Sequence, residues 1–182
     1  DISNASVNKR SKAGMSHIPE DRHKHGLILD YSLEDNIVLQ RYHEPEFQSK
    51  GFIKREAIRE YANKIIEQYD VRSGQGAITI ARSMSGGNQQ KVSIGKWLLA
   101  GCDILIIDEP TVGVDVGAKR HIHEIIWNLA KNEGKSIILI SSELPEVLGM
   151  SDRIIVMHEG RIKGQLSREE ADQVSIMKMA VS

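Results

Sequence analysis

The sequence predicts an α/β fold in which a mostly parallel sheet is flanked by helices, and three observations predict it. A short β-branched run, Ile104–Ile107, is followed by two acidic residues and Pro110, which is typical of a central strand buried on both faces. A second apolar run, Ser136–Ile140, predicts another strand. Apolar residues recur at helical spacing over Lys54–Gln68, which predicts an amphipathic helix packed on a core.

The amino-terminal part predicts a helix, a strand and a second helix. Ser6–Lys12 is expected to form the first helix, and Met15–Ile18 a short strand that ends at Pro19. Within Leu27–Leu39 the apolar residues predict a short amphipathic helix. Ser32 is the expected N-cap of this helix.

Two loops precede a glycine-rich helix start. Arg41–Gly51 and Val71–Arg82 lack a regular pattern and predict irregular structure. Ser85 is a candidate N-cap, and Gly86 and Gly87 fill the first turn of the helix that follows. Backbone N–H groups left uncovered at the positive end of a helix dipole can bind a phosphate, although a glycine-rich helix start is more often only a turn.

Two carboxylates follow the central strand directly. Asp108 and Glu109 lie at its carboxyl end, where open α/β sheets bind their ligands. One carboxylate can hold Mg²⁺ and the other can polarise an attacking water. The alternative is a strand end that is merely acidic and solvated.

The rest of the chain predicts more helices and a hairpin. A helix begins at Asp115 or Gly117 and ends near Gly134, ahead of the strand Ser136–Ile140. The remaining predicted elements are a helix over Leu144–Gly149, a hairpin of Arg153–Met157 with Arg161–Leu166, and a terminal helix over Arg168–Met179.

Composition limits the function classes. The chain has 182 residues with 24 basic and 25 acidic side chains, so its bulk charge does not favour nucleic acid. A single cysteine, Cys102, excludes an internal disulfide and fits a reducing cytoplasm. Because no apolar run approaches the roughly 20 residues of a membrane span and no signal peptide is visible, we expect a soluble chain.

Three motifs at matching spacing resemble those of ABC-transporter ATPases. Ser85–Gln89 is similar to the signature motif, Ile104–Glu109 to the Walker B strand, and Pro110–Asp115 to the D-loop. Finer features resemble the second, carboxy-terminal ATPase half of double-cassette bacterial importers for sugars or nucleosides: Ile18–Arg22, Asn88–Lys91, Gly113–Lys119 and Ser141–Leu144.

The resemblance implies an ABC-type P-loop NTPase fold within one domain over residues 1–182. Residues 27–100 would form the helical subdomain that carries the signature, and residues 101–182 the core portion with Walker B, D-loop and switch loop. The phosphate-binding run G-x-x-x-x-G-K-[ST] does not occur in the sequence, and the chain starts at Asp1 without methionine. We therefore expect the downstream part of an ATPase half, inactive alone and prone to associate through exposed strands.

Two sets of site residues follow from the resemblance. The signature residues would cap ATP held by the partner half, namely Ser85, Gly86, Gly87, Asn88 and Gln89. This half's own site would use Glu109 as the catalytic carboxylate, Asp115 in the D-loop, Asp108 for Mg²⁺, Glu20 at the Q-loop position and Ser142 at the switch-loop position.

Two of these positions depart from the family pattern. Glu20 replaces a glutamine and can bind Mg²⁺ or water, but it repels phosphate unless a metal intervenes. Ser142 replaces a histidine and cannot carry charge near neutral pH. We therefore expect this half's own site to be the weaker of the two. Zinc binding by His17, His23 and His25 is disfavoured against a solvated loop, because acidic or cysteine ligands are missing from the pattern.

The expected function is that of an ATP-binding and ATP-hydrolysing importer subunit, with a slight preference for nucleosides over sugars from residues 17–29. Expected partners are an amino-terminal ATPase half or a second copy, the transmembrane permease subunits and, indirectly, a substrate-binding protein, at the cytoplasmic face of the membrane. One alternative is a degenerate regulatory half that does not hydrolyse ATP. Another is a non-transport ABC protein acting on DNA or ribosomes, which the balanced charge disfavours.

Overall fold

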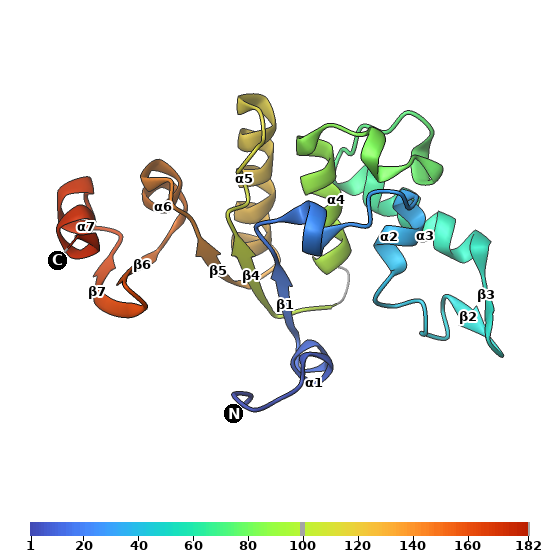
Figure 1. The fold of residues 1–182 in the computed structure, drawn as a ribbon, viewed down its shortest axis with the longest axis horizontal. Coiled ribbons are helices and arrows are strands. Elements are labelled where there is room, and N and C mark those ends of the chain that lie inside the picture. Colours follow the sequence, from blue (N-terminus) through green and yellow to red (C-terminus); the bar gives the residue numbers. More distant parts are fainter. Residues whose placement is uncertain (99–100, 182) are drawn as a thin grey trace. The chain divides into compact units, whose positions relative to one another are not determined.

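The computed structural model describes residues 1–98 and 101–181 (Figure 1). The chain divides into two compact units, residues 1–138 and 139–182, and each is described by itself. The predicted boundary between residues 100 and 101 touches a segment outside the described residues. The division into a helical subdomain and a core portion therefore stays a prediction.

A parallel strand pair forms the centre of the first unit. β1 (Met15–Ile18) pairs with β4 (Ile104–Asp108) in parallel, from Met15 opposite Ile104 to Ile18 opposite Ile107. β5 (Ser136–Ile140) follows β4 in the sheet order. The predicted strands and the α/β class are confirmed.

Burial in these strands is less complete than predicted. Leu105 and Ile107 of β4 are fully buried, whereas Ile104 and Ile106 on the opposite face are half-buried. The prediction that β4 is buried on both faces is therefore correct for one face and only partly correct for the other. In β5, which the sequence predicts only as an apolar strand, Ile138 is 52 % exposed.

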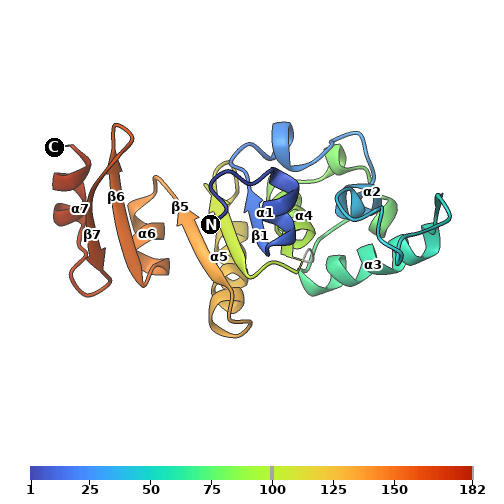
Figure 2. The same cartoon turned by 90° about the horizontal axis from the view of Figure 1, so that it is seen from below.

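Helices surround the strand pair of the first unit. In Figure 1, α2, α3 and α4 gather on one side of β1 and β4, while α1 lies beside β1 in Figures 1 and 2. Side-chain caps fix several starts as predicted: Ser6 caps α1, Ser32 caps α2 and Asp115 caps α5. The helices are α1 (Val7–Lys12), α2 (Leu33–Val38), α3 (Arg55–Gln68), α4 (Gly86–Leu98) and α5 (Val116–Lys131).

The predicted apolar stripe of α3 is a core face. Ile58, Ala62 and Ile65 are buried at successive helical positions. α4 packs closely against this face, because a Cβ built on Gly95 would lie 2.7 Å from Cγ2 of Ile65. α3 and α4 thus pack closely on each other within the first unit.

Segments predicted as loops contain short elements that local patterns did not reveal. A π-helical turn, η1 (Arg22–Gly26), follows β1, and a small hairpin joins β2 (Gln48–Ser49) to β3 (Phe52–Ile53). Two 3₁₀ turns, η2 (Gly76–Ile78) and η3 (Ala81–Ser83), lead into α4.

The second unit is a hairpin covered by two helices. Its elements are α6 (Leu144–Met150), the antiparallel strands β6 (Arg153–His158) and β7 (Arg161–Ser167), and α7 (Gln173–Ala180). Ile154, Val156 and Ile176 form most of its core. α7 begins later than the predicted Arg168 because Asp172 and Ser175 form a capping box there. Over the described part of the chain, no helix combines the length and apolar character needed to cross a membrane.

Candidate functional site

Acidic residues lie at the carboxyl ends of the neighbouring strands β1 and β4. Ile18 pairs with Ile107, so the next positions of both strands lie at the same edge. Asp108, the last residue of β4, is half-buried, and Glu20, two residues after β1, is exposed. The parallel register therefore places the backbones of these two predicted metal ligands at one edge of the sheet.

Glu109 adopts an unusual backbone conformation. Its φ is +44°, in the left-handed region that costs a residue with a side chain roughly 1–2 kcal/mol. This turn ends β4 and directs the chain into buried Pro110 and Thr111. Lys50, Asp70 and Glu159 share this conformation in turns, so the backbone of Glu109 fixes the turn after β4, and its catalytic role remains a prediction from the motif.

The segment that resembles a D-loop consists of turns held by long hydrogen bonds. Val112 N donates to Glu109 O, and Val114 N donates to Thr111 O, each at 3.3 Å. Asp115 then ends the segment as the N-cap of α5, accepting from Ala118 N at 3.0 Å. Its predicted role at the nucleotide would add to this structural role.

The predicted signature helix begins where the sequence placed it. α4 starts at Gly86, and the Ser85 hydroxyl accepts from Asn88 N at 3.5 Å and from Asn88 Nδ2 at 3.0 Å. Ser85 is therefore the N-cap, as predicted. The first N–H groups of a helix have no partner within the helix, so this end can accept an anion.

The other two signature side chains make internal bonds. Asn88 Oδ1 accepts from Arg72 N at 2.9 Å. Gln89 is buried, its Nε2 donates to Ala81 O at 2.9 Å, and its Oε1 lies 2.8 Å from Nε2 of His23. Among the signature side chains, exposed Ser85 is therefore better placed to contact ATP than Asn88 or Gln89, and that contact stays a prediction.

Arg22 is a residue that the sequence analysis did not assign to the site. Its Nη1 donates to Val112 O at 2.9 Å, and its Nη2 donates to Gly113 O at 3.3 Å. A Cβ built on Gly86 would lie 2.9 Å from Nη2 of Arg22. Burial lowers the pKa of the Arg22 guanidinium below its ordinary value, but an arginine stays charged at neutral pH. The motif Ile18–Arg22 includes this residue but does not indicate its role, because its contacts lie about 90 positions away along the chain.

The loop that carries Arg22 is also fixed on α4. Lys96 is buried, and its Nζ donates to Gly26 O at 2.9 Å. Burial lowers the pKa of this ammonium group to about 8. Asp21 accepts from His23 N and Lys24 N, each at 3.0 Å, and so caps the turn at its start.

Ser142 belongs to the second unit. It is exposed and follows the end of β5, next to Glu143, whose backbone N donates to the Ser141 hydroxyl at 3.0 Å. Its proposed place at the nucleotide is therefore a prediction from the motif. The structure brings Glu20, Asp108, Glu109, Asp115 and the signature residues into the first unit.

Within residues 1–98 and 101–181, no group of three or more histidine, cysteine or acidic side chains is arranged to hold a metal ion. Two carboxylates at the sheet edge still fit Mg²⁺, since this ion usually keeps several waters and binds few protein ligands beside phosphate oxygens.

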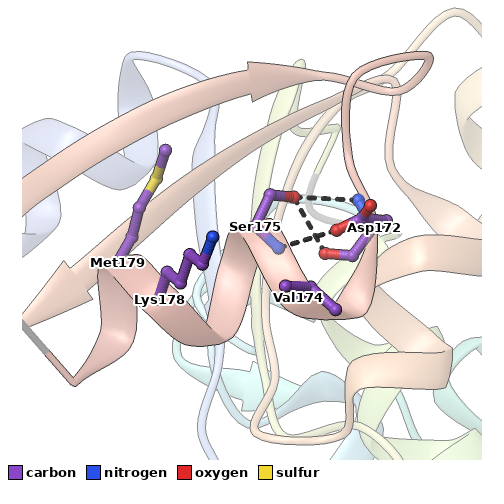
Figure 3. A pocket seen from close by; sticks show the side chains of 5 residues that line it. All are labelled: Asp172, Val174, Ser175, Lys178 and Met179. Atoms are coloured by element: carbon purple, nitrogen blue, oxygen red, sulfur yellow. Dashed lines mark hydrogen bonds between the residues drawn. The ribbon is translucent and has the colours of Figure 1, made fainter.

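A hollow of about 530 Å³ lies against α7, and none of its lining residues is a predicted site residue. Figure 3 shows that two of its lining residues, Asp172 and Ser175, bond to each other in the capping box. The other lining residues are Val174, Lys178 and Met179. The chemistry predicted for the chain does not involve this hollow.

A family model described as ABC transporter matches residues 2–112, more than half of the chain. The chain belongs to the ABC transporter family. Curated relatives of this ABC chain include ribose import ATP-binding proteins. One from Streptococcus agalactiae is 43 % identical over 180 residues, and one from Clostridium perfringens is 48 % identical over 168 residues. These matches cover 99 % and 92 % of the chain but 36 % and 33 % of the relatives, so the ABC chain spans about a third of their length.

Solved ATP-binding cassettes share the fold. A nucleotide-free cassette from an ABC transporter matches with a TM-score of 0.78 at 21 % identity, over 98 % of this chain and 73 % of the other. A dimeric cassette bound to ADP and phosphate matches with a TM-score of 0.71 at 19 % identity, over 90 % and 68 %. The predicted ABC ATPase fold is confirmed.

Proposed function

We propose that this ABC chain is part of the ATP-binding and ATP-hydrolysing subunit of a sugar importer, in its carboxy-terminal ATPase half. Relatives named ribose import ATP-binding proteins, at 43–48 % identity over nearly the whole chain, support this proposal. Their names favour a simple sugar such as ribose over the nucleoside that the sequence alone slightly preferred.

The observation that carries the proposal is the arrangement of three segments within the first unit. The acidic ends of β1 and β4, the D-loop turn and the start of the signature helix lie in one compact body, and Arg22 connects the last two. In the proposed mechanism, Ser85, Gly86 and Gly87 offer the positive end of α4 to ATP held by a partner half. That partner is the amino-terminal half of the subunit or a second copy.

The strand-end carboxylates serve this half's own nucleotide. Asp108 and Glu20 would hold Mg²⁺, which neutralises phosphate charge when bound. Glu109 would accept a proton from the attacking water, and Asp115 would contribute from the D-loop. The Ser142 hydroxyl can donate a hydrogen bond to phosphate but, unlike a histidine, stays neutral. This half's own site is therefore the slower one in the proposal.

Transport requires partners that this chain does not contain. We place the subunit at the cytoplasmic face of the membrane, bound to permease subunits and acting indirectly with a substrate-binding protein. The relatives' import names support this placement. Solute choice belongs to the other subunits.

The test is ATP hydrolysis and ribose uptake by the full-length importer with Glu109→Gln. Glu159→Gln is a matched control, because Glu159 also has a left-handed φ, +47°, but lies in the exposed β6–β7 turn. We expect Glu109→Gln to lower hydrolysis at this half's site on the order of a hundredfold while ATP still binds, and the control to be unchanged.

Three results would contradict the proposal. With the partner half inactivated, no hydrolysis by the wild type would indicate a regulatory half that does not hydrolyse ATP, and equal measurable hydrolysis by wild type and Glu109→Gln would reject Glu109 as the catalytic carboxylate. Uptake of nucleosides in place of ribose by the reconstituted importer would overturn the sugar assignment.

A further inference from the structure

Arg22 lies between two segments that face nucleotide in the proposed function. It is the first residue of η1, directly after β1, and its guanidinium reaches two successive carbonyls of the D-loop turn. The distances are 2.9 Å to Val112 O and 3.3 Å to Gly113 O. A planar guanidinium can bind two neighbouring acceptors at once, which a lysine ammonium does not reproduce.

The internal hydrogen bonds of the D-loop turn are long. Its internal hydrogen bonds, Val112 N to Glu109 O and Val114 N to Thr111 O, are both 3.3 Å long. Val112 and Gly113 are exposed, and Gly113 has a φ of +67°. Bonds from a charged donor are stronger than those between neutral groups, so the two bonds from Arg22 restrain this turn more than its long internal bonds do.

The start of the signature helix also lies against the Arg22 guanidinium. A Cβ built on Gly86 would lie 2.9 Å from Nη2 of Arg22 and 2.9 Å from Gly113 O. Gly86, Arg22 and Gly113 are therefore in close contact, and a side chain at position 86 would separate them. The glycine permits the start of α4 to approach the D-loop.

The base of Arg22 is fixed on the same helix. His23 bonds to buried Gln89 at 2.8 Å, and buried Lys96 donates to Gly26 O at 2.9 Å. Nε of Arg22 is buried and has no hydrogen-bond partner among the described residues. The η1 turn thus moves with α4, while the tip of Arg22 holds the D-loop.

From these contacts we infer that Arg22 is a positioning residue that fixes the D-loop turn at Val112–Gly113 to the start of the signature helix at Gly86. The inference rests on the proposed function for its catalytic consequence. The restraint itself depends only on contacts within this chain. Motion of the signature segment is transmitted to the D-loop through this side chain.

The test is hydrogen exchange on the full-length protein without nucleotide, followed by mass spectrometry of peptides over residues 109–118 and 84–92. The variants are Arg22→Met and Arg22→Lys. Arg82→Met is the matched control, because Arg82 lies on the same unit and pairs with Asp30 at 2.8 Å on the surface. A second perturbation, Gly86→Ala, acts on the same contact from the other side.

We expect amides of the D-loop peptide to exchange about tenfold faster in Arg22→Met, since two bonds from a charged donor are lost. Arg22→Lys should fold normally yet leave the D-loop amides exchanging faster than in wild type. Gly86→Ala should accelerate the same peptide, and Arg82→Met should not. In ATPase assays, Arg22→Met should lower kcat on the order of tenfold with KM for ATP within about twofold, as loss of positioning predicts.

Unchanged D-loop exchange in Arg22→Met and Gly86→Ala would overturn the inference. Faster exchange spread evenly over the chain would overturn it too, because it would assign Arg22 to general stability. If Arg22→Met does not fold, Arg22→Lys and Gly86→Ala decide between these outcomes. Faster D-loop exchange in a protein that does not hydrolyse ATP would keep the restraint and reject the proposed function.

Discussion

His23 and Gln89 are joined by a hydrogen bond of 2.8 Å that ties the loop after β1 to the signature helix. Since Nε2 of Gln89 already donates to Ala81 O at 2.9 Å, its Oε1 is the acceptor and Nε2 of His23 is the donor. The bond fixes both the amide orientation and the proton-bearing nitrogen of His23. Although Gln89 lies in the signature motif, both ends of its amide are bonded within this chain, so its role here is structural.

This bond predicts a measurable coupling energy. His23→Ala leaves Oε1 of the buried Gln89 without its donor and should lower the free energy of unfolding by about 1–3 kcal/mol. A double-mutant cycle with Gln89→Ala should give about 1 kcal/mol of coupling, from urea unfolding. His25→Ala, an exposed histidine on the same loop, is the control and should change stability by less than about 0.5 kcal/mol. A coupling energy near zero would contradict the assignment.

Lys96 predicts a rise in stability with pH. Burial lowers its pKa from 10.5 to about 8 in the folded protein. Between these values the folded state has lost the proton that the unfolded state keeps, so the free energy of unfolding should rise by up to about 1.4 kcal/mol per pH unit. Below pH 8 both states are protonated and this contribution is constant.

Urea unfolding at pH 7.5, 8.5 and 9.5 measures this effect. The range stays below pH 10 because of Tyr69, whose pKa is raised by burial to about 12. Above pH 10 this tyrosine ionises in the unfolded state before it does so in the folded state, which lowers the free energy of unfolding and would oppose the effect of Lys96. Lys96→Met should flatten the slope, whereas Lys64→Met, at an exposed site on α3, should retain it. A slope shared by all three proteins would exclude Lys96 as its source.

Alanine should have opposite effects on stability at two helical glycines, one packed tightly between α3 and α4 and one with open space around it. Gly95→Ala adds a Cβ 2.7 Å from Cγ2 of Ile65 and should destabilise the protein by about 1–3 kcal/mol, despite the better helix propensity of alanine. Gly149→Ala, in α6 with open space around it, should stabilise by roughly 0.5–1 kcal/mol. Thermal unfolding of both variants tests the comparison. Equal shifts would mean that the helices do not pack as described.

The proposed division of labour between the two nucleotide sites predicts unequal effects of two serine substitutions. Ser85→Arg introduces a bulky side chain at the exposed start of α4, where the partner's ATP would bind. It should lower the rate of ribose transport on the order of a hundredfold. Ser142→Ala removes a hydroxyl from the slower site and should lower transport by less than about threefold. Ser49→Arg, exposed in β2, is the control. Comparable losses in the first two variants would reject the division.

Local signals predicted most of the regular elements. Ser32 and Ser85 were identified as caps because the N-cap rule depends on a short polar side chain and its neighbours three residues on. β1 and β4 followed from short apolar runs ended by Pro19 and by the Asp108–Glu109 pair. The site motifs around these elements were found for the same reason, since their residues are close in sequence.

The missing parts depend on contacts between distant segments. The η1 turn over Arg22–Gly26 is held by Val112, Gly113, Gln89 and Lys96, none of which is a neighbour in sequence. A local pattern therefore predicts only a polar loop there. An apolar run predicts the strand Ser136–Ile140 but not what covers its side chains, and Ile138 is 52 % exposed.

The tight space around Gly86 has a consequence for related sequences. A Cβ at position 86 would lie 2.9 Å from the flexible end of Arg22 and also 2.9 Å from the backbone carbonyl of Gly113. The arginine could move away, but the carbonyl belongs to the D-loop turn itself, so a shorter side chain at position 22 would not make room for a larger one at 86. Relatives should therefore keep glycine at position 86 even where position 22 varies.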